Sequence, residues 1–125
     1  MVIATKYSIG YKRKEANIKV NTQGNGNKSM SISVDASLKK LGTHYIDILY
    51  LHFWDYTTSV EEIMQSLNNL VRSGKVLYLG ISDTPAWIVA KCCQYAKDHG
   101  LAQFVIYQGL FNVMSVHFVI SRVFS

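Results

Sequence analysis

The sequence predicts an α/β fold in which helices connect the strands of a parallel sheet. Short apolar segments alternate with longer segments that carry apolar residues at helical spacing. Turn and capping residues separate these segments. The resulting order is strand–helix–strand–helix–strand–helix–strand, which implies parallel strands joined by helical crossovers. With 125 residues, the chain is long enough for one compact domain.

The first strand is expected at residues 2–5, a β-branched and apolar segment. A long polar connection at 8–29 follows, with a Gly-Asn-Gly-Asn turn sequence at 24–27. Connections of this length inside a compact domain are often lids or binding loops. The first helix is expected to end at Gly42, and its apolar stripe consists of Met30, Val34, Leu38 and Leu41.

Residues 46–51 are almost continuously apolar, which predicts a second strand covered on both faces. Ser59 and Glu62 form a capping box that starts the second helix at residue 60. This helix has an i, i+3, i+4, i+7 stripe of apolar residues and ends at Gly74.

A third strand is expected at 76–81 and a fourth at 104–107. Between them, Thr84 is expected as the N-cap and Pro85 as the first residue of a helix that runs to Gly100.

Composition limits the classes of protein. Hydrophobic residues make up 49% and charged residues 17% of the chain, so a packed core is expected rather than disorder. The cysteines, Cys92 and Cys93, are adjacent and are expected to be packing residues in a reducing compartment. No apolar run approaches the roughly 20 residues of a membrane-spanning helix, and the first residues lack a signal-peptide pattern. A soluble cytoplasmic protein with no membrane partner is therefore expected.

The net charge is +5, and much of the excess lies at residues 12–14, at Lys19 and Lys28, and at residues 39–40. These residues are either a solvated loop and a helix end favoured by its dipole, or a site for a polyanion. Because Tyr11 is the only aromatic residue interleaved with the basic loop, no nucleic-acid partner is expected.

Polar residues end or directly follow all four expected strands. They are Lys6, His52, Ser82 with Asp83, and Gln108. Parallel sheets bind their ligands at the carboxyl ends of the strands. The four positions are therefore expected to share one active face.

Each residue also has a simpler interpretation. Lys6 is either a surface lysine or a cation that lowers the pKa of a neighbouring acid. His52 is either structural or a group that orients a substrate oxygen or transfers a proton. Phe53 and Trp54 either wall an apolar substrate pocket or pack the end of the sheet. The serine and aspartate after the third strand either recognise an amide or begin the next helix.

Two kinds of site have no support in the sequence. His44, His99 and His117 show no metal-ligand spacing with one another, so no metal site is expected. A Gly-x-Gly-x-x-Gly pattern is missing, so a Rossmann dinucleotide site is not expected.

Long stretches of the chain are similar to a known family. They are VIATKY at 2–7, SVDASLKKL at 33–41, YIDILYLHFWDYTTS at 45–59, GKVLYLGISDTPAW at 74–87 and IYQG at 106–109. These segments resemble the aldo-keto reductase superfamily, most closely its fungal aryl-alcohol dehydrogenase and norsolorinic acid reductase-like branch. The resemblance covers most of residues 1–114.

The resemblance implies a (β/α)8 barrel that transfers a hydride between NADPH and an aldehyde or ketone. It implies that Lys6 is the lysine that lowers the pKa of the catalytic tyrosine, and that His52 orients the carbonyl. Ser82 and Asp83 match the Ser-Asn pair that binds the nicotinamide carboxamide, and Gln108 matches the glutamine that does the same. Asp83 departs from the asparagine of the broad superfamily, although the sequence Ser-Asp-Thr-Pro is typical of this branch.

By resemblance, residues 1–114 supply the third to sixth βα positions of the barrel, and residues 115–125 form a divergent tail. A closed barrel needs about 250 residues, so an unclosed sheet is expected. The family's catalytic Asp and Tyr, and its site for the adenosine phosphate, fall outside these positions. We therefore expect part of an NADP-dependent oxidoreductase for aryl or related carbonyl compounds, inactive as an isolated chain.

Two other functions stay open: a non-catalytic remnant, and a module that associates with other chains. The edges of an unclosed sheet carry N–H and C=O groups that pair readily with another strand. The resemblance implies a small carbonyl substrate for an active chain, and the open edges imply self-association.

Overall fold

The computed structural model describes residues 1–9 and 23–109 of the chain. Strands and helices alternate along it. The strands are β1 (Ala4–Tyr7), β2 (Ile46–Leu51), β3 (Val76–Ser82) and β4 (Phe104–Gln108). The helices are α1 (Asn27–Leu41), α2 (Val60–Arg72) and α3 (Ala86–Asp98). Most of the basic loop and the whole tail, with its expected boundary at residue 114, lie outside the described residues.

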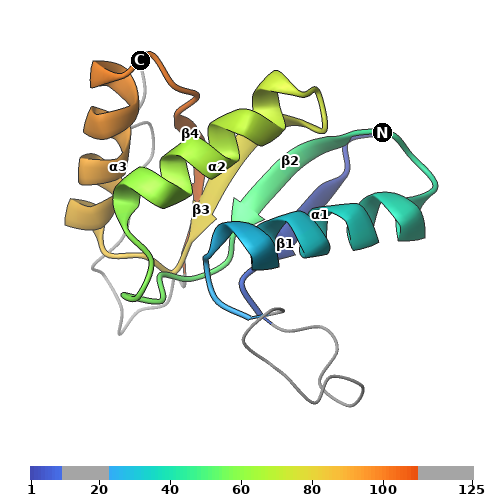
Figure 1. Cartoon of the computed structure of the whole chain (residues 1–125), viewed down its shortest axis with the longest axis horizontal. Helices are drawn as coiled ribbons and strands as arrows, with labels where there is room; N and C mark the ends of the chain where they lie inside the picture. Colours follow the sequence, from blue (N-terminus) through green and yellow to red (C-terminus); the bar gives the residue numbers. More distant parts are fainter. Residues whose placement is uncertain (10–22, 110–125) are drawn as a thin grey trace.

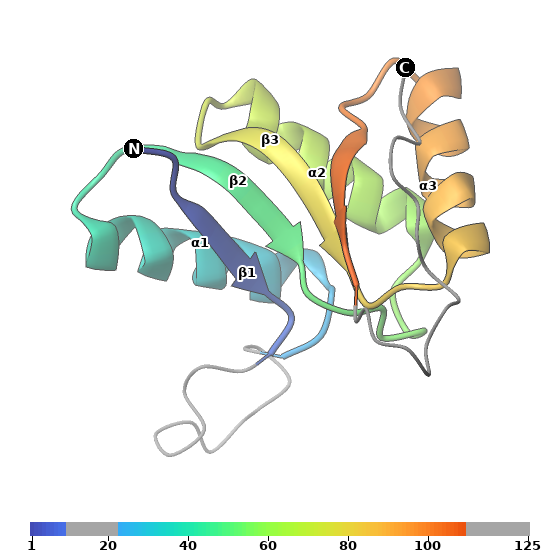
Figure 2. The ribbon, with the colours of Figure 1, turned by 180° about the vertical axis from the view of Figure 1, so that it is seen from behind.

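The strands form one parallel sheet in the order β1-β2-β3-β4, which is also their order along the chain. All three helices lie on the same side of this sheet (Figure 1). The view from behind shows the opposite face, with no described helix in front of it (Figure 2). The described sheet does not close into a barrel, so the predicted class, an α/β fold matching part of a (β/α)8 barrel, is confirmed.

The core lies between the sheet and the helices. Successive side chains of a strand point to opposite faces, so Leu49 and Leu51 of β2 share the helix-covered face with Leu79 and Ile81 of β3. Apolar residues of all three helices pack against them: Met30, Val34, Ile63, Met64, Leu67, Ile88, Val89, Cys92 and Ala96.

β2 differs from the prediction that both its faces would be covered. Leu49 and Leu51 are buried on the helix-covered face. On the other face Ile46 is buried, but Ile48 and Tyr50 are only half-buried. The sequence of β2 is apolar without interruption because large apolar side chains lie on this second face too. No described helix packs against them. β1 also lies two residues later than predicted, so Lys6 is inside the strand rather than after it.

The pairing of β3 with β4 contains an irregularity. Leu79 pairs with Phe104, but the next residue, Gly80, pairs with Ile106, so β4 carries one extra residue at this point. A shift of this kind, as in a β-bulge, changes which side chains of two strands stand opposite one another.

The helix ends follow the sequence in part. Ser59 caps α2 as predicted, since its Oγ accepts a hydrogen bond from the backbone N–H of Glu62 at 3.1 Å. The carboxylate of Glu62 accepts a bond from Asn27 N–H, at the start of α1. Gly42 ends α1 in the left-handed conformation with φ 63°, also as predicted.

The start of α3 was predicted wrongly. Pro85, not Thr84, occupies the N-cap position. The Thr84 hydroxyl instead donates a hydrogen bond to the backbone carbonyl of Ser82 at 2.8 Å. This threonine therefore shapes the connection after β3 rather than the end of the helix.

Two residues on the same face of β3 test whether burial against the helices carries the stability of the sheet. Ile81 is fully buried against the helices, whereas Leu77 is 44% exposed. We expect Ile81→Ala to lower the free energy of unfolding by about 2–5 kcal/mol, because it removes buried methylene groups and leaves a cavity. Leu77→Ala is the matched control, expected to cost less than about 1 kcal/mol. Urea denaturation measures both, and equal losses would contradict this account of the core.

Candidate functional site

The parallel register brings the carboxyl ends of the four strands to one edge of the sheet (Figure 2). Lys6 pairs with Tyr50, Tyr50 with Gly80, and Gly80 with Ile106, which makes a continuous row across the strands. Two residues further along β3, Ser82 pairs with Gln108 of β4. Residues far apart in sequence thus become neighbours at one edge.

Lys6 and Tyr50 project from the face opposite the helices. Their neighbours Tyr7, Leu49 and Leu51 are buried on the helix-covered face, and alternation directs Lys6 and Tyr50 the other way. The Lys6 ammonium lies over the Tyr50 ring, 5.4 Å from its centre. This separation is within the range of a cation–π interaction.

His52 follows β2 at the same edge. Its backbone N–H donates a hydrogen bond to the carbonyl of Tyr7 at 3.1 Å, which continues the pairing of β1 and β2. Because His52 is two residues beyond Tyr50, the alternation of the strand directs both side chains to the same face. The His52 side chain is half-buried, and its ring centre is 6.5 Å from that of Phe53.

Ser82 presents a hydroxyl without a partner. Its side chain is 1% exposed, and Ser82 Oγ makes no hydrogen bond. Beside it, the Asp83 N–H donates to the Gln108 carbonyl at 3.3 Å, and the Gln108 residue is exposed. A buried hydroxyl without a partner costs free energy. Six of the described residues carry a buried side-chain oxygen without a partner, and Ser82 is the one that pairs in register with Gln108. Ser82 and Gln108 together can donate to and accept from an amide group.

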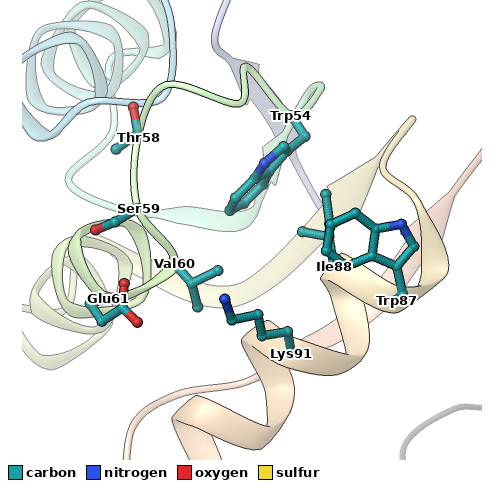
Figure 3. A pocket seen from close by; sticks show the side chains of 8 residues that line it. All are labelled: Trp54, Thr58, Ser59, Val60, Glu61, Trp87, Ile88 and Lys91. Carbon is teal, nitrogen blue, oxygen red and sulfur yellow. The ribbon is translucent and has the colours of Figure 1, made fainter.

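The predicted pocket residues Phe53 and Trp54 lie apart. Phe53 is half-buried beside His52. Trp54 packs in the core and lines an open cavity of about 210 Å³ between the first turns of α2 and α3, together with Val60 and Lys91 (Figure 3). Trp54 is therefore on the helix side of the sheet, whereas Lys6 is on the opposite face. A role of these two residues in binding substrate stays a prediction.

A clamp that the sequence analysis missed holds the loop after β2. The Asp55 carboxylate accepts hydrogen bonds from the backbone N–H of Thr57 at 2.9 Å, of Thr58 at 3.0 Å and of Asn25 at 2.7 Å. The Asn25 side-chain amide donates to the Phe53 carbonyl at 2.9 Å. The segment before α1 is thereby tied to the loop that begins with His52.

Strained backbone marks the same edge. Among the described residues, three that are not glycine have a positive φ: Ser8 at 104°, Tyr56 at 59° and Asp83 at 41°. They lie in the connections that follow β1, β2 and β3, respectively. Such conformations cost free energy and cluster at functional sites. They therefore support this edge as the functional one.

Other groups in the described residues offer no second centre of chemistry. Residues 1–9 and 23–109 contain no group of His, Cys, Asp and Glu side chains arranged to hold a metal ion. Cys92 and Cys93 are free and buried, and burial raises the pKa of the Cys92 thiol to about 12. Their predicted role as packing residues is confirmed by their place in the core. None of the described helices is both long and apolar enough to cross a membrane.

Comparison with known proteins agrees with this geometry. Residues 1–124 match the Aldo/keto reductase family. Norsolorinic acid reductase B of Dothistroma septosporum is 66% identical over 113 residues, which cover 90% of this chain and 29% of that protein. The aryl-alcohol dehydrogenase [NADP(+)] of Phanerodontia chrysosporium is 57% identical over 117 residues, covering 90% and 30%. A putative aryl-alcohol dehydrogenase of Saccharomyces cerevisiae, AAD14, is 51% identical over 120 residues, covering 94% and 32%.

The chain belongs to the aldo/keto reductase family. The resemblance seen in the sequence is thereby confirmed, including the fungal branch to which these relatives belong. The chain spans about 30% of the length of these three relatives.

The Asp55 clamp predicts a pH dependence of stability. Burial alone raises the pKa of Asp55, but the hydrogen bonds from Asn25, Thr57 and Thr58 outweigh burial and lower it below 3.8. Because the folded-state pKa is below the unfolded one, the ionised carboxylate stabilises the fold above pH 3.8. This stabilisation is lost as the pH falls through the folded-state pKa.

We expect Asp55→Asn to lower the free energy of unfolding by about 1–3 kcal/mol at pH 7, and to flatten its decline between about pH 5 and pH 3. Asp98→Asn, at an exposed carboxylate on α3, is the matched control and should preserve the decline. Urea denaturation at a series of pH values measures both. A pH profile of Asp55→Asn parallel to that of the unaltered chain would refute the clamp.

Proposed function

We propose that this chain is the part of an NADP-dependent aldo-keto reductase that carries the nicotinamide-facing edge of the sheet. The reaction is hydride transfer that interconverts aryl or related aldehydes and ketones with alcohols. Two relatives, an aryl-alcohol dehydrogenase [NADP(+)] and a norsolorinic acid reductase, support this reaction class by their names. The free cysteines support a reducing, cytoplasmic location.

The observation that carries the proposal is the unpartnered hydroxyl of Ser82. It is buried at the carboxyl edge, in register with Gln108, and its Oγ makes no hydrogen bond. A carboxamide has one acceptor oxygen and two donor hydrogens, which a serine hydroxyl and a glutamine amide can satisfy together. The residues present therefore fit a nicotinamide, with Asp83 beside them. The nicotinamide ring, when bound, supplies or accepts the hydride.

Lys6 and His52 carry the functional groups needed to protonate and orient the oxygen of a carbonyl substrate. A lysine ammonium lowers the pKa of an acid placed next to it, which makes that acid a better proton donor at neutral pH. A histidine ring donates a hydrogen bond to a carbonyl oxygen and orients it. Lys6 on β1 and His52 after β2 lie on adjacent strands, so both can act on one substrate oxygen.

We propose that the isolated chain has little or no turnover. Hydride transfer is favoured in a site that excludes water and surrounds the developing charge with fixed dipoles. The described sheet is open on the face that bears Lys6 and Tyr50, so water has access to any substrate there.

Nicotinamide binding tests the proposed function. We expect nicotinamide mononucleotide to shift the NMR signals of Ser82, Asp83 and the Gln108 side-chain amide. Ser82→Ala should weaken binding by about fivefold, the equivalent of one hydrogen bond of about 1 kcal/mol. Ser37→Ala, on α1 with its hydroxyl bonded to the Ser33 carbonyl, is the matched control.

Signals that shift only elsewhere, or equal affinity in the Ser82→Ala variant, would overturn the site. In the same sample, NADPH and benzaldehyde should react no faster than in buffer. A steady oxidation of NADPH that His52→Ala abolishes would refute the proposed inactivity.

A second candidate function is self-association through the sheet edges. β1 and β4 are the edge strands of the described sheet, and Val105 of β4 is 48% exposed. Edge strands offer backbone groups to a strand of another chain, and a charged side chain on the edge opposes this pairing.

We expect concentration-dependent oligomers in size-exclusion chromatography with light scattering, and Val105→Lys should shift them toward monomer. Leu41→Lys, at an exposed leucine on α1, is the control and should leave the distribution unchanged. A chain that stays monomeric at all concentrations, or oligomers that resist Val105→Lys, would exclude association through β4.

A further inference from the structure

Tyr50 occupies the centre of the row that crosses the sheet at the site. It pairs with Lys6 on one side and with Gly80 on the other. Its ring is held by both neighbours, since it lies beneath the Lys6 ammonium and over the backbone of Gly80. The resemblance to the family assigns no role to Tyr50.

Gly80 makes room for this ring. A Cβ atom built on Gly80 would lie 2.5 Å from Tyr50 Cε1 and 2.6 Å from Cδ1. Real carbon atoms do not approach so closely, so any residue other than glycine at position 80 must displace the ring. The backbone of Gly80 has no positive φ. The close approach of the ring, rather than the backbone conformation, is therefore what requires glycine here.

The Lys6 ammonium has few other partners besides the Tyr50 ring. It makes no ion pair with any carboxylate in the described residues, and its side chain is exposed. A long, exposed lysine samples many rotamers unless a partner restricts it. The ring face of a tyrosine attracts an ammonium through its quadrupole.

We propose that Tyr50, seated on Gly80, is the positioning residue that directs the Lys6 ammonium toward the carboxyl edge of the sheet. The functional meaning of this position rests on the proposed function, in which Lys6 acts on a neighbouring acid. The contact between Tyr50 and Lys6 does not rest on the proposed function. The contact and the function can therefore be tested separately.

The test is the NMR signal of the Lys6 Cε protons in the full chain with ¹³C-labelled lysine, assigned by its loss in Lys6→Arg. Protons over the face of an aromatic ring are shifted upfield by the ring current. We expect the Lys6 signal upfield of that of Lys97, an exposed lysine on α3. Tyr50→Phe should retain the shift, because it keeps the ring, and Tyr50→Leu should abolish it.

A purely space-filling Tyr50 would give a different result. In that case Tyr50→Leu would lower stability but leave the Lys6 signal where it was, and this outcome would overturn the proposal. Loss of the shift in Tyr50→Phe would overturn it as well, since that variant preserves the ring. Nicotinamide binding at Ser82 is measured independently, so failure of one test is distinguishable from failure of the other.

Gly80 provides a second variant. Gly80→Ala should reduce the upfield shift of Lys6, because the added methyl group displaces the ring. If Gly80→Ala is too unstable to study, the double variant Tyr50→Ala, Gly80→Ala removes the clash. It should be more stable than the sum of the two single variants predicts. Strict additivity of the two substitutions, or an unchanged Lys6 signal in Gly80→Ala, would show that the ring is not seated on Gly80.

Discussion

The structure depends on the parallel register of four strands whose connecting helices all lie on one side. Because each strand runs in the same direction, each of the connections that follow β1, β2 and β3 emerges at the same edge. Lys6, His52, Ser82 and Gln108 are separated by up to about a hundred positions in sequence, yet the register of the strands places all four at this edge. Pairing of the backbone is therefore what brings the candidate site residues to one edge.

The two faces of the sheet differ in what they carry: one carries the hydrophobic core and the other the candidate site. The helix-covered face buries Leu49, Leu51, Leu79 and Ile81 and makes the hydrophobic core. The opposite face carries Lys6 and Tyr50, and the connections beyond it hold strained residues and the hydrogen-bonded Asp55. Stability on one face permits strain and unpaired polar groups at the edge of the other, as is common for scaffolds that position a site.

Much of the fold could be predicted because apolar periodicity and turn residues reflect local physics. The strand at 46–51, the cap at Ser59 and the stop at Gly42 agree with the structure. Thr84 was mistaken for a cap because a hydroxyl before a helix can bond to either side, and only tertiary structure decides between them. Asp55 had a local signal, an aspartate two residues before a threonine as in a turn, but its bond to Asn25 spans 30 positions. Tyr50 was counted as one more apolar strand residue, since no local pattern reveals that Gly80 lies beneath its ring.

The irregular pairing of β3 and β4 has a consequence for the polar groups at the carboxyl edge. Leu79 pairs with Phe104, and an uninterrupted ladder would then have set Tyr107 against Ser82. The single additional residue on β4 moves the ladder by one position and brings Gln108 there instead. A phenol in place of a carboxamide would offer one hydroxyl where two donors and an acceptor now stand. One additional residue on β4 therefore determines which hydrogen-bonding groups stand opposite Ser82.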